Sequence, residues 1–96
     1  ERAGWTMALA APGGVLAVTL ADRDGRTLPG LAVTATAGRP STTAEDRVLD
    51  LAANGTAYRA GETLAPGLWD VAVEARSNGE LVYAERGRIH VARDGG

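Results

Sequence analysis

The chain has 96 residues, a formal net charge of −2 and no cysteine. A chain of this length forms one small domain with a single modest core, and the lack of cysteine excludes disulfides, thiol catalysis and thiolate metal sites. All ten basic residues are arginines spread along the chain, so no basic stripe exists to follow nucleic-acid phosphates, and no nucleic-acid partner is expected.

Short segments in which apolar and polar residues alternate lie between Gly-, Pro- and Asn-containing turns. A period of two is typical of strands with one buried face. In chain order, the predicted strands are residues 4–11, 14–22, 30–38, 46–52, 56–61, 67–76 and 80–92. Seven such strands in about 100 residues favour an all-β fold, an immunoglobulin-like antiparallel β-sandwich.

Three local features along these segments give finer predictions. Ser41 to Asp46 could form one capped helical turn or a loop. The Asn78-Gly79 pair predicts a tight type I′ hairpin turn between the last two strands. The apolar register of the final strand changes around Gly87, which predicts a β-bulge there.

The few aromatic residues are interpreted as structural. Trp69 opens an alternating run after Pro66-Gly67, and we expect it to fill the core while its indole N–H reaches a carbonyl. The alternative is an exposed platform on which a sugar or nucleotide stacks. Tyr58 resembles a tyrosine corner, in which the hydroxyl ties a strand to the preceding turn. Trp5 shares one face of the first strand with Met7.

No catalytic constellation is found in the sequence. Ser41 and Ser77 fall in predicted loops, and the single histidine, His90, should point outward between two apolar residues. With one Met, one His and no Cys, no metal site or cofactor is predicted. Asp22 and Asp24 begin like a calcium loop, but the later ligands are missing, so the segment is read as a turn. We therefore expect a protein that is not an enzyme.

Several segments together resemble a known family. They are Arg2-Ala3-Gly4-Trp5; Asp22-Arg23-Asp24-Gly25 followed by Pro29-Gly30; Gly38-Arg39-Pro40 with Asp46-Arg47 and Leu49-Asp50-Leu51; Tyr58; and Pro66-Gly67-Leu68-Trp69-Asp70. In this order and spacing, from about Gly4 to Val91, the chain resembles the soluble region of FixH proteins, which are related to YtkA-like domains. It departs from the pattern at Thr27, where a Pro is often found.

The resemblance implies that residues 1–96 are a single sandwich domain held on the periplasmic side of a bacterial inner membrane. The anchor would be an N-terminal transmembrane helix that precedes Glu1. FixH proteins accompany a copper-transporting P-type ATPase and an iron-sulfur membrane protein, and they assist assembly of a high-affinity haem-copper terminal oxidase. On this reading the partners are membrane proteins of that system, and the loop containing Arg39, Pro40 and Asp46 is the candidate contact surface.

Two other functions remain open at the level of sequence. One is a copper-binding chaperone or carrier that uses Met7 and His90. The other is a carbohydrate-binding or adhesive module, which requires an exposed Trp69.

Overall fold

The computed structural model describes residues 4–40 and 42–92, and this part of the chain is built almost entirely of strands. In chain order the elements are β1 (Thr6–Ala10), the short 3₁₀ turn η1 (Pro12–Gly14), β2 (Val15–Ala21), β3 (Ala32–Arg39), β4 (Thr42–Asn54), β5 (Ala57–Thr63), β6 (Gly67–Ser77) and β7 (Glu80–Val91). All strand pairs are antiparallel. The predicted all-β fold is confirmed.

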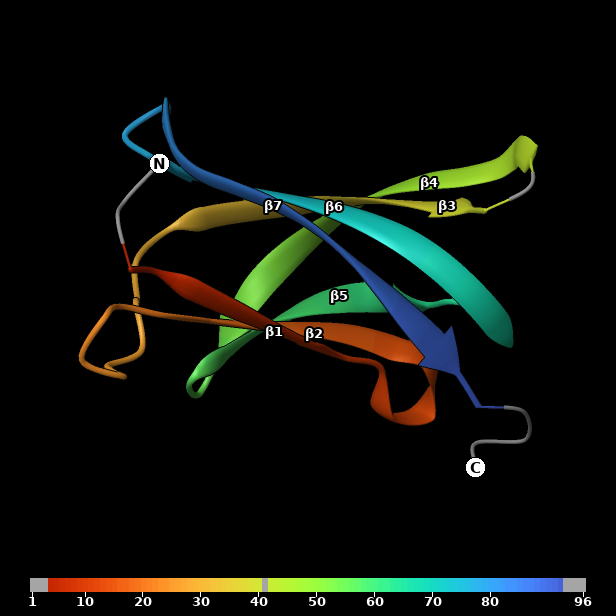
Figure 1. Cartoon of the computed structure of the whole chain (residues 1–96), viewed down its shortest axis with the longest axis horizontal. Coiled ribbons are helices and arrows are strands. Elements are labelled where there is room, and N and C mark those ends of the chain that lie inside the picture. Colours follow the sequence, from red (N-terminus) through yellow and green to blue (C-terminus); the bar gives the residue numbers. More distant parts are fainter. Residues whose placement is uncertain (1–3, 41, 93–96) are drawn as a thin grey trace.

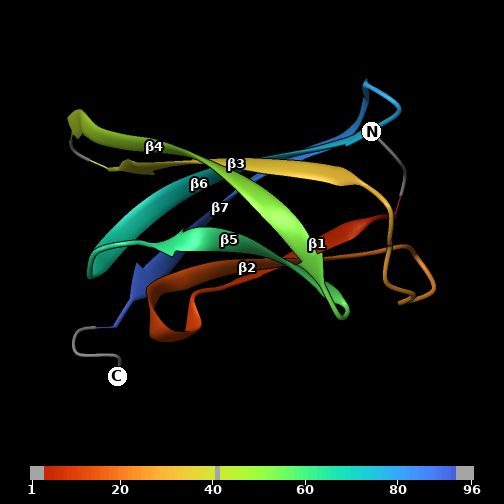
Figure 2. The ribbon, with the colours of Figure 1, turned by 180° about the vertical axis from the view of Figure 1, so that it is seen from behind.

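The strands form two layers that are joined through β4. The order along the continuous sheet is β1-β2-β5-β4-β3-β6-β7, and Figures 1 and 2 show β1, β2 and β5 in one layer below β3, β6 and β7 in the other. In Figure 2, β4 runs diagonally from the upper layer to the lower one. Leu51 is paired with Val33 of β3 and with Ala60 of β5, so the sheet folds over at this residue.

The core lies between the layers and is lined by the inward face of each strand. Burial alternates strictly along β2, as the period of two predicts. The largest fully buried side chains are Trp69 and Tyr83, surrounded by Leu, Val and Ala. No polar or charged residue is buried within residues 4–40 and 42–92, apart from side chains 42–45, which are not described.

The segment before Asp46 is a strand, so the predicted helical turn or loop there is wrong; Ser41 itself lies outside the described residues. β4 begins at Thr42, and Arg39 pairs with Thr42 after a register shift that follows Ala37. A single helical turn fixes several residues for one hydrogen bond. Pairing with β3 instead gives the backbone of this segment a partner strand.

The hairpin between β6 and β7 confirms one prediction and corrects another. Asn78 (φ 54°) and Gly79 (φ 84°) both have positive φ, as a type I′ turn requires. The bulge, however, lies at Val82 and not near Gly87, because Tyr83 pairs with Ala75 whereas Leu81 pairs with Arg76. Two consecutive inward side chains, Val82 and Tyr83, result from this extra residue.

Tyr58 ties β5 to the loop between β2 and β3. Its hydroxyl donates to the carbonyl oxygen of Leu28 at 2.6 Å and accepts from the amide of Leu31 at 3.2 Å. This loop lies about 30 residues upstream in the chain, so the hydroxyl does not bond to the immediately preceding turn as the tyrosine-corner interpretation expected. The bonds fix the entry into β3.

Gly87 makes room for β1 rather than for a bulge. A β-carbon on Gly87 would lie 2.6 Å from Cδ1 of Leu9 and 3.8 Å from Cε of Met7. Both side chains come from β1, which approaches β7 at the open end of the sheet order. Side chains of β1 therefore pack directly over the backbone of β7.

We expect Gly87→Ala to destabilise the protein by about 1–3 kcal/mol, because the added methyl overpacks the contact between β1 and β7. Urea unfolding measures this change. Gly61→Ala is the matched control, since Gly61 lies in β5 and a β-carbon there would meet nothing within 4 Å. Equal stabilities for the two variants would contradict the packing role of Gly87.

Candidate functional site

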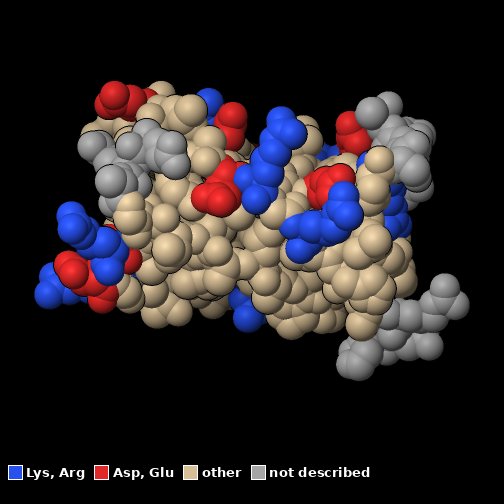
Figure 3. All heavy atoms as spheres, in the orientation of Figure 1, with Lys and Arg blue, Asp and Glu red and all other residues tan. Residues whose placement is uncertain are grey.

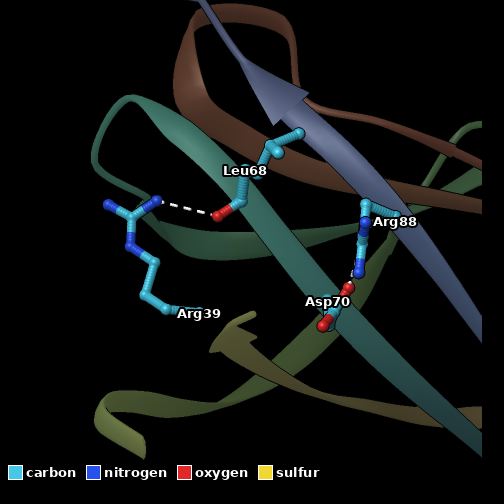
Figure 4. Close-up of polar contacts among 4 residues, drawn as sticks. All are labelled: Arg39, Leu68, Asp70 and Arg88. Atoms are coloured by element: carbon cyan, nitrogen blue, oxygen red, sulfur yellow. Dashed lines mark hydrogen bonds and ion pairs between the residues drawn. The ribbon is translucent and has the colours of Figure 1, made fainter. Parts of the chain in front are cut away.

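The side chain of Arg39 reaches from the end of β3 to the connection between β5 and β6. Its guanidinium donates through Nη1 to the carbonyl oxygen of Leu68 at 2.8 Å and through Nη2 to that of Pro66 at 3.1 Å. Figure 4 shows the first of these bonds. The pairing of β3 with β4 shifts its register between Ala37 and Arg39, directly before this side chain. Arg39 thereby joins two segments that lie far apart in the sequence.

The same guanidinium covers the indole of Trp69. Its central carbon lies 3.9 Å from the ring centroid, which is within the range of a cation–π contact. Trp69 is only 1% exposed, and its Nε1–H donates to the carbonyl oxygen of Ala65 at 2.9 Å. An exposed stacking platform at Trp69 is therefore ruled out, and with it the carbohydrate-binding alternative that required one.

Gly67 is required by this arrangement for two reasons. Its φ of +119° lies in a region that residues with a side chain rarely adopt. A β-carbon there would also lie 2.8 Å from Nη1 of Arg39. We use the name Arg39 clamp for Arg39, Trp69 and residues 65–68, which together close one end of the core.

The predicted contact loop between Arg39 and Asp46 is shorter than expected, because most of it belongs to β4. Arg39 binds within its own domain, and Asp46 lies in β4, which begins at Thr42. Pro40 and Asp46 are exposed. One carboxylate oxygen of Asp46 lies 2.6 Å from the point where a β-carbon on Gly38 would be. The structure therefore presents Pro40 and Asp46 where the end of β3 lies beside β4.

An open groove of about 470 Å³ crosses the outer side of the β3, β6 and β7 layer. Its floor is made of small residues, including Thr36, Gly38 and Ala72. Beside it, Nε of Arg88 donates to Oδ1 of Asp70 at 2.7 Å (Figure 4), and this bond together with the carboxylate charge raises the pKa of Arg88. Figure 3 shows acidic and basic side chains interspersed on the side of the molecule that faces the viewer.

The described residues do not bring together a set of metal-binding side chains. No cluster of three or more His, Asp or Glu side chains suited to a metal ion occurs among them. Met7 packs inward against Gly87, whereas His90 is exposed on the opposite face of β7. The two residues of the copper-carrier hypothesis therefore do not face each other. Trp5 is partly buried, with its ring centroid 5.9 Å from that of Tyr83.

A comparison of the sequence with protein-family models assigns the chain to a family. The FixH family model matches residues 1–90, nearly the whole chain, and the protein belongs to the FixH family. FixH is not a known enzyme family, and membership is consistent with a role in oxidase-related processes. Comparisons with curated proteins and with solved structures gave no significant match.

Sequence reasoning found the residues of the Arg39 clamp but not their connection. Arg39 and Pro66-Gly67-Leu68-Trp69 were both recognised as family motifs. The glycine two residues before Trp69 was the signal in the sequence that could have indicated this contact. A glycine at the start of a strand often marks a place where another group approaches the backbone closely. The groove could not be found without the strand register.

We expect Arg39→Lys to destabilise the protein by about 1–2 kcal/mol, because an ammonium group cannot donate two planar hydrogen bonds while lying flat on the indole. Urea unfolding followed by Trp fluorescence measures the effect, and the emission should shift to the red. Arg59→Lys is the control, since Arg59 is exposed on β5 and has no ion pair in the described structure. A loss no greater than that of the control would contradict the clamp.

Proposed function

We propose that this protein is a non-enzymatic accessory factor for assembly of a high-affinity haem-copper terminal oxidase and that it acts together with a copper-transporting P-type ATPase. The family match over residues 1–90 is the observation that carries the proposal. The buried Trp69 and the separation of Met7 from His90 leave protein contact as the mode of action with most support.

The proposal includes a membrane tether on the periplasmic side. The described part of the chain has no helix of the length and apolarity needed to cross a bilayer. In this proposal the tether is an N-terminal transmembrane helix that precedes Glu1. Its effect would be to raise the local concentration of the domain near its membrane partners, which strengthens weak contacts without additional interface.

The hairpin of β3 and β4 is the contact surface we favour. Pro40 and Asp46 are exposed, and the Arg39 clamp fixes the strand that leads to Pro40. Holding the end of β3 in place lowers the conformational entropy that this strand loses on binding. This supports recognition at the hairpin by a membrane partner, although Arg39 itself acts within the domain.

We expect Pro40→Arg and Asp46→Arg, each introduced into the full-length gene of a deletion strain, to lower oxidase activity several-fold. The reason is that disrupting a hot-spot residue of an interface costs about 2 kcal/mol or more of binding free energy. Oxidase activity of membranes from cells grown at low oxygen is the readout, with protein abundance checked by immunoblot.

Asp24→Arg is the matched control, because Asp24 is exposed in the connection between β2 and the start of β3. Normal activity in both hairpin variants, at normal abundance, would remove the hairpin as the contact surface. Normal activity in the deletion strain itself would remove the assembly function.

A further inference from the structure

The outer face of the layer formed by β4, β3, β6 and β7 has an ordered charge pattern. Three rows of residues that are not buried cross it at right angles to the strands, as the pairing registers show. From β7 to β4 the rows are Arg88, Asp70, Gly38 and Asp46; Arg86, Ala72, Thr36 and Val48; and Ala84, Glu74, Thr34 and Asp50. We call these twelve residues the outer face.

The two margins of the outer face carry opposite charge. The β7 margin presents Arg86 and Arg88, whereas the β4 margin presents Asp46 and Asp50 on either side of Val48. Val48 is 72% exposed and is the most exposed large apolar side chain in the described structure. An apolar residue between two acids is thus placed across a shallow groove from two cations.

We infer that the partner of this face is a second copy of the same chain, packed face to face about a twofold axis parallel to the strands. This rotation places the β7 margin of one copy over the β4 margin of the other and keeps each row opposite itself. Arg88 then meets Asp46 of the second copy, and the stem of Arg86 covers Val48. Each contact occurs twice, as twofold symmetry requires.

The charges select this axis over the other twofold axis in the plane of the face. Rotation about an axis perpendicular to the strands would place Arg86 and Arg88 over the same margin of the second copy, and like charges in close contact repel. Both axes keep the two sheets aligned, which is the common geometry of stacked β-sheets, so the charges alone decide between them.

The cations of the β7 margin have donor groups to spare. Arg88 uses Nε for its bond to Asp70, which leaves its terminal N–H groups for an acceptor on the second copy. Arg86 has no ion pair or hydrogen bond from its side chain within the described structure. From its row, Arg86 can also reach diagonally to Asp50 of the second copy, since long side chains span this spacing.

The size of the face indicates a weak, reversible dimer. Four strands about 4.8 Å apart and three rows about 6.6 Å apart cover roughly 400 Å² per copy. A stable complex of standard size buries about 800 Å² per partner. The association should therefore be visible only at high protein concentration and should weaken as salt screens its charges.

The test compares the wild-type chain with Arg86→Glu and Asp50→Arg by sedimentation over about 10 µM to 1 mM, a range suited to small interfaces. We expect the average mass of the wild type to rise with concentration. Each variant alone should associate at least tenfold more weakly, because the side chains at positions 86 and 50 of opposite copies then carry the same charge in both symmetry-related contacts. An equimolar mixture of the variants should recover the dimer, since both contacts then join opposite charges.

Arg59→Glu is the matched control, because it makes the same charge change on β5, outside the outer face. It should associate like the wild type. A wild type that stays monomeric throughout, a control that loses association as much as Arg86→Glu, or a mixture that fails to recover would each overturn the inference. Circular dichroism of every variant establishes that the fold is intact, and recovery in the mixture cannot come from unfolded chains.

Discussion

The burial of Trp69 is the contact on which the rest of the structure depends. The chain has no Phe, and the core around this indole is built mainly from Leu, Val and Ala. Losing one large ring from such a core would cost on the order of 3–5 kcal/mol, a large part of the stability of a small domain. The indole lies at the end of the sandwich, so it also needs a cover, which Arg39 and residues 65–68 provide.

This cover links the core to the candidate contact surface. Arg39 ends β3, and the exposed hairpin residues Pro40 and Asp46 follow within seven residues of it. A change that loosens the core around Trp69 would therefore also move the hairpin. The family motifs at Arg39-Pro40 and at Pro66-Gly67-Leu68-Trp69, which are separate in the sequence, form a single structural unit.

The fold was predictable because its signals are local. Alternation along β2 and β6 and the Asn78-Gly79 pair indicate strands and a turn through neighbours in the sequence. The early start of β4 was missed because residues 42–46 do not alternate between apolar and polar. The bulge was misplaced because Leu81, Val82 and Tyr83 are all apolar, so the pattern does not show which residue is extra.

The candidate site was less predictable, for a different physical reason. Arg39 bonds to carbonyl oxygens that lie 27 and 29 residues away, and backbone carbonyls leave no mark in a sequence. The outer face depends on the register of four strands, two of which, β3 and β6, pair across a long separation in the chain. The charges of Arg86 and Asp50 are unremarkable until pairing places them on opposite margins of one surface.

The passage of β4 from one layer to the other joins the two layers along one edge of the sandwich. Leu51 pairs with strands of both layers, so the layers cannot separate at this edge unless backbone pairing is lost. At the opposite edge β7 and β1, the two end strands of the sheet, face each other, and β1 is a strand of five residues paired only with β2. We expect transient separation of the layers to begin at this edge, so that amide hydrogens of β1 exchange with solvent before those of β3 and β6.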